Sequence, residues 1–157
     1  MALLLTALPI AVVGAALWWA RRYLVRVTVE GQSMRPTLNQ GDVVLVRRTT
    51  GRGLRPGRLV IALPQGPSDG ATGPVQVAGQ HWLVKRVAAL RPDDGPGLGD
   101  EGLRGTLAPG TAYLLGDNPQ ASYDSRAAGP FPIDRLVGVV LCRLREAPSD
   151  LPEHKAG

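Results

Sequence analysis

Two side chains of this 157-residue chain, Ser33 and Lys85, are of types that can act together as a nucleophile and its base. A serine hydroxyl is a weak nucleophile until a neighbouring base accepts its proton, and a lysine that has lost its own proton can be that base. Lysine is rare in this chain, because arginine supplies 16 of the 18 basic residues. Arginine keeps its proton in proteins, so Lys85 can do what the arginines cannot.

The surroundings of both residues are compatible with catalysis and also with a plainer role. Ser33 follows a strand-like run, in a bend of sequence EGQSMRPTL that Gly31 helps to shape. Lys85 shares the alternation of Leu83 and Val87, which predicts an inward-facing side chain. The plainer alternatives are an ordinary polar turn at Ser33 and a lysine that buries its stem and exposes its ammonium group.

A polar segment, GDNPQASYDSRAAGPFP (116–132), is the third feature that can contribute to such a site. It is either a loop capped by its own side chains, or a shell in which a hydroxyl orients the lysine and an Asp–Arg ion pair holds the loop. Three of the five serines of the chain lie in this segment and in the bend around Ser33.

Other kinds of site lack their sequence patterns here. There is no GxxxxGK[ST] loop, HExxH motif or Cys/His cluster, so we expect no nucleotide, no metal and no organic cofactor. The histidines, His81 and His154, are poorly placed for a Ser-His-Asp triad. The net charge of +5 comes from scattered arginines without interleaved aromatic residues, so nucleic acid is not an expected partner. Cys142 cannot form an intramolecular disulfide, and we expect it to be a small core residue.

Alternating apolar residues predict the strands that must position these groups. In LVRVTVE (24–30), Val25, Val27 and Val29 share one face. Together, 20 Gly and 14 Pro exclude an all-helical bundle. We therefore expect a mainly β, compact antiparallel domain over residues 23–146. The further expected elements are strands at 43–47, 59–63, 81–90, 112–115 and 136–144, surface loops at 64–79 and 91–110, and a flexible tail at 147–157.

The N-terminal segment has the composition of a membrane anchor. Residues 2–20 carry no charge and are followed by Arg21, Arg22 and Tyr23. About twenty such residues cross a bilayer as a helix, and the Trp, Tyr and Arg cluster is typical of the interface. We predict an uncleaved transmembrane anchor at 1–22, with a cleaved signal peptide or a buried core helix as alternatives. By the positive-inside rule alone, the arginines after the span would place the remaining chain in the cytoplasm.

Four segments, in this order after an apolar anchor, resemble the boxes of the type I signal peptidases, which are membrane-anchored Ser/Lys endopeptidases. They are GQSMRPTL, GDVVLV, VKRV, and GDNPQASYDSR followed by GPFP. The resemblance runs from about residue 27 to 140. It implies a signal-peptidase-like β domain, the signal peptides of exported preproteins and the lipid bilayer as partners, and no cofactor. It also implies a single-pass cell-membrane protein whose catalytic domain is extracytoplasmic, against the charge rule; long domains translocate largely regardless of flanking charge.

The resemblance also implies a role for each matching residue. Ser33 would be the acylating nucleophile and Lys85 the neutral general base, with the Ser122 hydroxyl orienting the lysine amine. Asp124 and Arg126 would form the ion pair that braces the site, while Asp117 and Asn118 would be structural. The residues that would line shallow pockets, for an Ala-x-Ala-like pattern in a peptide that docks as an added strand, are Val27, Val29, Leu38 and Val84.

The chain departs from the family pattern at three places. Many bacterial members have Ser or Thr two residues before the nucleophile, where it contributes to the oxyanion hole, but this chain has Gly31. One such donor is worth about 3 kcal/mol. The glycine is similar to the mitochondrial inner-membrane branch, which is compatible with backbone donors alone. RPDD (91–94) replaces the usual PGD, and the segment between Val87 and Leu115 is too short for a large accessory domain, as in a minimal member.

Other functions remain open alongside general leader-peptide removal. One is a maturation protease of the same fold that is dedicated to a single precursor. Another is a non-catalytic, membrane-tethered β module. The related self-cleaving repressors also use Ser and Lys, but they carry a helical DNA-binding domain, and the apolar segment with GDNPQASYDSR argues against that type.

Overall fold

The computed structural model describes residues 12–15, 18, 21–51, 53–65, 75–77 and 80–147. Most of the predicted anchor therefore lies outside the described residues, as does the predicted tail beyond Ala147. Within the part of the chain that is described, no helix has both the length and the apolar character needed to cross a bilayer.

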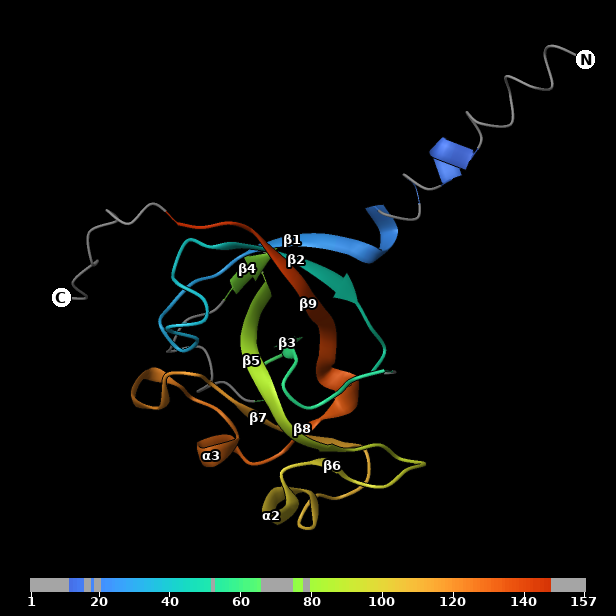
Figure 1. The fold of residues 1–157 in the computed structure, drawn as a ribbon, viewed down its shortest axis with the longest axis vertical. Coiled ribbons are helices and arrows are strands. Elements are labelled where there is room, and N and C mark those ends of the chain that lie inside the picture. Colours follow the sequence, from blue (N-terminus) through green and yellow to red (C-terminus); the bar gives the residue numbers. More distant parts are fainter. Residues whose placement is uncertain are drawn as a thin grey trace, which may run out of the picture.

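The described residues form nine strands joined in one sheet, in which every pairing is antiparallel (Figure 1). The order is β1-β2-β9-β3-β5-β7-β8, and β4 and β6 also pair with β5. The mainly antiparallel β prediction is thus confirmed. The strands are β1 (Leu24–Thr28), β2 (Val43–Arg48), β3 (Leu59–Ala62), β4 (Val75–Val77), β5 (Gln80–Arg91), β6 (Leu98–Gly99), β7 (Thr111–Leu115), β8 (Phe131–Pro132) and β9 (Leu136–Arg145).

Short helical turns fill the connections between the later strands. They are α2 (Glu101–Arg104), α3 (Ser125–Ala128) and the 3-10 turns η2 (Pro119–Ala121) and η3 (Ile133–Arg135). The α3 turn begins at Asp124, whose side chain accepts a hydrogen bond from the Arg126 backbone N–H. It ends at Gly129, whose φ of 79° is in the left-handed region that glycine adopts readily.

The two predicted loops contain regular structure. Residues 64–79 include β4, which pairs with β5 through the register Gln76 to His81. Residues 91–110 include β6 and α2. The loop predictions were wrong in these places because β4 and β6 are too short to show an alternating pattern. Both are held by pairing with the long strand β5, which their own sequences do not encode.

The sheet is packed with apolar side chains on both faces. On β5, Leu83 and Val87 belong to one buried cluster with Leu114 and Phe131, whereas Val84 belongs to a second cluster. Successive side chains of a strand point to opposite faces, so the alternation of β5 also separates Lys85 from its neighbour Arg86. The neighbouring residues Lys85 and Arg86 of β5 therefore lie in two different environments.

Cys142 is exposed, so its predicted place in the core was wrong. Residues of β9 are buried from Leu136 only as far as Val140, and the strand continues beyond the core as a partner of β2. The apolar run in the sequence continues past the point where the neighbouring strands cover it.

Candidate active site

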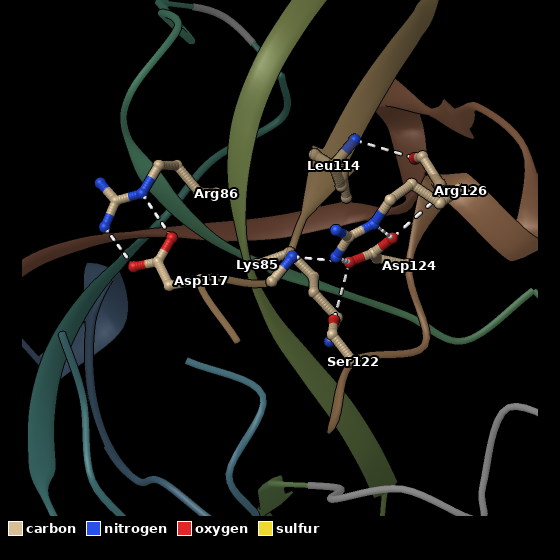
Figure 2. Close-up of polar contacts among 9 residues, drawn as sticks. Lys85, Arg86, Leu114, Asp117, Ser122, Asp124 and Arg126 are labelled. Atoms are coloured by element: carbon tan, nitrogen blue, oxygen red, sulfur yellow. Dashed lines mark hydrogen bonds and ion pairs between the residues drawn. The ribbon is translucent and has the colours of Figure 1, made fainter. Parts of the chain in front are cut away.

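Lys85 is buried in the middle of β5, with only 1% of its surface exposed. Its Nζ donates a hydrogen bond to Ser122 Oγ at 3.0 Å (Figure 2). Burial lowers the pKa of Lys85 to about 8, with the Asp124 carboxylate opposing this change and Arg126 adding to it. A substantial fraction of such a lysine is neutral slightly above neutral pH, so it can accept a proton.

Ser122 connects Lys85 to a carboxylate. Its hydroxyl donates to Asp124 Oδ2 at 2.8 Å, so its oxygen is left to accept from Lys85. This arrangement fixes the direction of both hydrogen bonds. The predicted orienting hydroxyl is therefore in contact with the lysine amine, and Asp124 in turn holds the hydroxyl.

Asp124 is completely buried and fully hydrogen-bonded. The Gly116 backbone N–H donates to its Oδ2 at 2.8 Å, while Arg126 Nε donates to Oδ1 at 2.9 Å and Nη2 to Oδ2 at 2.5 Å. Burial alone would raise the pKa of Asp124, but the hydrogen bonds from Arg126, Gly116 and Ser122 lower it to about 2. The expected Asp–Arg ion pair is present and stays ionised at neutral pH.

Ser125 secures this pair to the sheet. Its buried Oγ accepts a hydrogen bond from the Leu114 backbone N–H of β7 at 2.8 Å. Ser125 is not among the site residues predicted from the sequence. The available signal was its position in the sequence between Asp124 and Arg126. Because these two residues form an ion pair, the residue between them is held close to the end of β7.

Ser33 lies in the bend after β1 and is 8% exposed. The Asn118 backbone N–H donates to the Ser33 carbonyl oxygen at 2.9 Å, and Asn118 Nδ2 donates to the Gln32 carbonyl at 3.2 Å. These bonds tie the serine bend to the start of the 116–132 segment, whose later residues hold Lys85. Asn118 thus joins the two segments through both its backbone and its side chain.

Gly116 lies against both Ser122 and the backbone of the serine bend. A Cβ atom on Gly116 would lie 2.1 Å from Ser122 Oγ and 2.7 Å from the Ser33 carbonyl oxygen. Only glycine allows both groups to come so near. Gly116 is not among the predicted site residues, because this crowding exists only in three dimensions.

Gly31 adopts a φ of 79°. A residue with a side chain is strained by roughly 1–2 kcal/mol in this left-handed conformation. The glycine at this position is therefore required by the turn as well as being a departure from the family's usual hydroxyl residue.

The four residues predicted to line substrate pockets are brought together in the second buried cluster. Their side chains are between 1% and 4% exposed, and they pack with Met34, the neighbour of Ser33. They come from β1, the segment after it, and β5: Val27, Val29, Leu38 and Val84.

A second carboxylate–arginine pair lies on the other side of β5 (Figure 2). Arg86 Nε donates to Asp117 Oδ1 at 2.8 Å and Nη2 to Oδ2 at 2.6 Å, and Thr37 Oγ1 also donates to Asp117. Burial opposes the change, but the hydrogen bonds from Arg86 and Thr37 lower the pKa of Asp117. Arg86 and Thr37 are not among the predicted site residues, although Arg86 directly follows Lys85.

Asp42 lies in the chain just after the serine bend and bonds to three other groups there. It is buried, and its carboxylate accepts from the Asn39 backbone N–H at 2.9 Å, from Arg143 Nη1 at 3.1 Å and from the Ala147 backbone N–H at 2.8 Å. The first residue of the predicted tail is thus bonded to the domain.

No group of three or more His, Cys, Asp or Glu side chains that could hold a metal ion occurs within the described ranges. The titratable groups that do gather around Lys85 are one acid and one arginine, already paired with each other. The charges of these two groups act on the pKa of the Lys85 amine.

Comparison with known proteins shows which proteins this chain is similar to. The chain is 32% identical over 130 residues, 78% of its length and 72% of the relative's, to the mitochondrial ATP-independent inner membrane protease subunit 1a of Arabidopsis thaliana. It is 33% identical over 147 residues, 87% of its length and 85% of the relative's, to the mitochondrial inner membrane protease subunit 1 of Schizosaccharomyces pombe. The mouse protein of that name is 29% identical over 123 residues, 75% of this chain and 68% of its own length.

The family model described as signal peptidase, peptidase S26, matches residues 1–94 and 99–144. This match spans the serine bend, Lys85 and the whole 116–132 segment. The chain belongs to the signal peptidase family, peptidase S26.

Proposed function

We propose that this chain is a serine endopeptidase that removes N-terminal leader peptides from exported proteins, with Ser33 as nucleophile and Lys85 as general base. The observation that carries this proposal is the state of Lys85. It is buried, its pKa is about 8, and its amine donates to a hydroxyl whose own proton is already committed to Asp124. A lysine that served only as a surface charge would keep its ammonium group in water.

The proposed mechanism uses the neutral form of Lys85. The lysine nitrogen donates one N–H to Ser122, which leaves its lone pair free to accept the Ser33 hydroxyl proton. The serine oxygen attacks the scissile carbonyl, and the tetrahedral intermediate collapses to an acyl-enzyme as the protonated lysine gives its proton to the leaving amine. A water molecule, deprotonated in turn by neutral Lys85, then hydrolyses the ester and restores Ser33.

Backbone donors of the serine bend are proposed to hold the oxyanion, because Gly31 has no side-chain hydroxyl. The Gly31→Ser substitution would add a donor worth about 3 kcal/mol if it reached the oxyanion. The φ of 79° works against this gain by roughly 1–2 kcal/mol of strain. The turn at Gly31 therefore favours a site that relies on backbone N–H groups.

The proposed substrate is an extended peptide with small residues before the cut, in an Ala-x-Ala-like pattern. Val27, Val29, Leu38 and Val84 would form the floor of its pockets, since they pack tightly beside Met34 and leave little depth for a larger side chain. The peptide would add a strand to the sheet, with its main chain providing most of the affinity.

The domain arrangement that fits this function is an anchor at residues 1–22, a catalytic domain at 23–146 and a tail at 147–157. The anchor would hold the site at the membrane surface, where leader peptides emerge. We propose a single-pass protein of the cell membrane with its catalytic domain on the extracytoplasmic side. The curated relatives are named as mitochondrial inner membrane proteases, so they share a membrane setting with this proposal.

The direct test is cleavage of an exported precursor that carries an Ala-x-Ala site, by the full chain in detergent or liposomes. The parent protein is expected to cut, and Ser33→Ala and Lys85→Ala are expected to be inactive. Mass spectrometry of the product would locate the cut. Cleavage that survives in Ser33→Ala would contradict the assignment of the nucleophile.

A protease of the same fold that is dedicated to one precursor is the second candidate. In that case the parent would react with a serine-directed acylating probe at Ser33 and yet leave a general Ala-x-Ala precursor intact. A non-catalytic β module would fail to react with the probe as well.

A further inference from the structure

A hollow of about 1050 Å³ lies at the end of the domain where the chain enters from its N-terminal segment. Arg22 and Tyr23 line one side of it, and Arg47 and Arg48, the last residues of β2, line another. The start of β1 and the end of β2 lie side by side, as the register Leu24 to Arg47 requires (Figure 1). The lining thus combines the chain just after the apolar segment with the folded domain.

The hollow carries a net positive charge. Three arginines line it against a single carboxylate, that of Asp134 in η3. Arg47 and Arg48 are exposed, and neither forms an ion pair with any carboxylate in the part of the chain that the structure describes. Both side chains line the hollow although alternation along β2 directs them to opposite sides of the strand, so they reach the hollow from different directions. A bound anion would therefore be contacted from more than one side.

The position of the hollow indicates which anion it meets. Arg22 also lies over the ring of Trp18, 5.7 Å from its centroid, in the cluster of aromatic and basic residues that ends the apolar segment. Such clusters lie at the level of lipid headgroups. Arginine binds phosphate groups through two parallel N–H bonds, and each basic residue near an anionic membrane surface adds to the attraction.

We propose that this hollow binds the phosphodiester of an anionic lipid headgroup. The lipid would fix the orientation of the domain on the membrane, through contacts at the start of β1. The serine bend lies away from the hollow, because the chain from Tyr23 to Val29 that leads to it spans about 20 Å when extended. The inference uses the predicted membrane anchor for its placement but does not depend on peptidase activity.

The test measures lipid binding by the full chain in dodecyl maltoside, from the rise in its unfolding temperature with added ligand. The probes are dihexanoyl phosphatidylglycerol, dihexanoyl phosphatidylcholine and inorganic phosphate. Arg47→Gln/Arg48→Gln removes two charges from the hollow. Arg55→Gln/Arg58→Gln removes two exposed arginines that do not line it, and serves as the charge-matched control.

We expect phosphatidylglycerol to bind, with an affinity that falls roughly tenfold or more in Arg47→Gln/Arg48→Gln and less than twofold in the control. Asp134→Asn should have the opposite effect and strengthen binding a few fold, which keeps the test decisive if the double variant folds poorly. Equal losses in both double variants, an equal response to phosphatidylcholine, or an equal response to inorganic phosphate would each overturn the proposal. So would a parent protein that does not respond to phosphatidylglycerol.

Discussion

The 116–132 segment supplies the carboxylates of two carboxylate–arginine pairs. The pairs lie on opposite sides of β5 and differ in what surrounds them (Figure 2). Asp124 is fully buried and its partner Arg126 approaches from the same short turn. Asp117 keeps 15% of its side chain exposed and pairs with Arg86, which is 31 positions away. The first pair lies beside Lys85, and the second joins β5 to the serine bend through Thr37.

The two pairs have different roles: the first acts on the pKa of Lys85, and the second holds two segments of the chain together. Asp124 and Arg126 act on the pKa of Lys85 in opposite directions, so together they add little net charge and leave burial to lower it. Asp117 and Arg86 make no such contribution to Lys85 and hold two segments in place. Substitutions in the two pairs should therefore change different measurable properties.

The largest difference is expected in folding stability. Asp124→Asn should lower the free energy of unfolding by about 3 kcal/mol, because it breaks a buried, fully hydrogen-bonded pair. This is the lower end of the usual range, since Arg126 is 41% exposed and can be hydrated. Asp117→Asn should cost only about 1 kcal/mol. Urea denaturation at pH 7 measures both, and equal losses would remove the distinction between the pairs.

The contribution of the Asp124 carboxylate to the free energy of unfolding should depend on pH in the acid range. The pKa of Asp124 is lowered in the folded state to about 2, from an ordinary value of 3.8. Its stabilising contribution is therefore complete above pH 4 and is lost as pH falls from about 4 to 2. In Asp124→Asn this part of the pH dependence of the unfolding free energy should disappear.

Gly116→Ala should reduce the rate of leader-peptide cleavage by about 100-fold, because its Cβ would displace Ser122 and the Ser33 backbone from each other. Gly102→Ala in α2 is the matched control, as its Cβ would meet no heavy atom closer than 3.4 Å. Values of kcat/KM for the two variants make the comparison. Wild-type activity in Gly116→Ala would show that the site tolerates this displacement.

Lys85→Met should inactivate the protein and yet stabilise it by about 2 kcal/mol at pH 7. Because the folded-state pKa of Lys85 is about 8, against 10.5 for the unfolded chain, the unfolded state binds one more proton between these values. Stability of the parent should therefore rise as pH increases from 8 to 10.5. The Lys85→Met variant lacks this pH dependence of stability, which stabilises it relative to the parent at pH 7. It also lacks the hydrogen bond to Ser122, and this loss of about 1 kcal/mol reduces the gain. Thermal unfolding across this pH range measures the difference, and parallel curves would contradict the prediction.

The smallest effect is expected on the pH dependence of cleavage. Activity of the parent should rise with pH through about 8 as Lys85 becomes neutral. Arg126→Gln leaves Asp124 unbalanced, which raises the pKa of Lys85 and should move the profile to higher pH by about 0.5 to 1 unit. Arg86→Gln should leave the profile in place. A profile that moves equally in both variants would show that the two pairs do not differ in this way.

Sequence patterns predicted the parts of this molecule that depend on local alternation. The inward position of Lys85 followed from Leu83 and Val87 and is confirmed, as are the six longer strands. The short strands β4, β6 and β8 were missed because they exist through pairing with the longer strands β5 and β7. The same alternation wrongly placed Cys142 in the core, since it does not indicate where neighbouring strands end.

The site was predictable where its residues lie close together in the sequence. Asp124 and Arg126 are two positions apart, and their pairing is present as expected. Arg86 and Asp117 meet only through the packing of β5 against the polar segment, and the crowding at Gly116 needs the serine bend as well. Such contacts join distant segments, so residue types and spacing do not reveal them. The membrane anchor stays a prediction from composition.

The central claim is that Lys85 is a neutral base at working pH, and the composition of the chain makes this directly measurable. Only two lysines are present, so ¹³C labelling of lysine Cε gives two signals, and Lys155→Arg identifies the one from Lys85. We predict that Lys85 titrates with a pKa of about 8 and that cleavage activity rises over the same range. Two signals that both titrate near the ordinary lysine value of 10.5 would contradict the account.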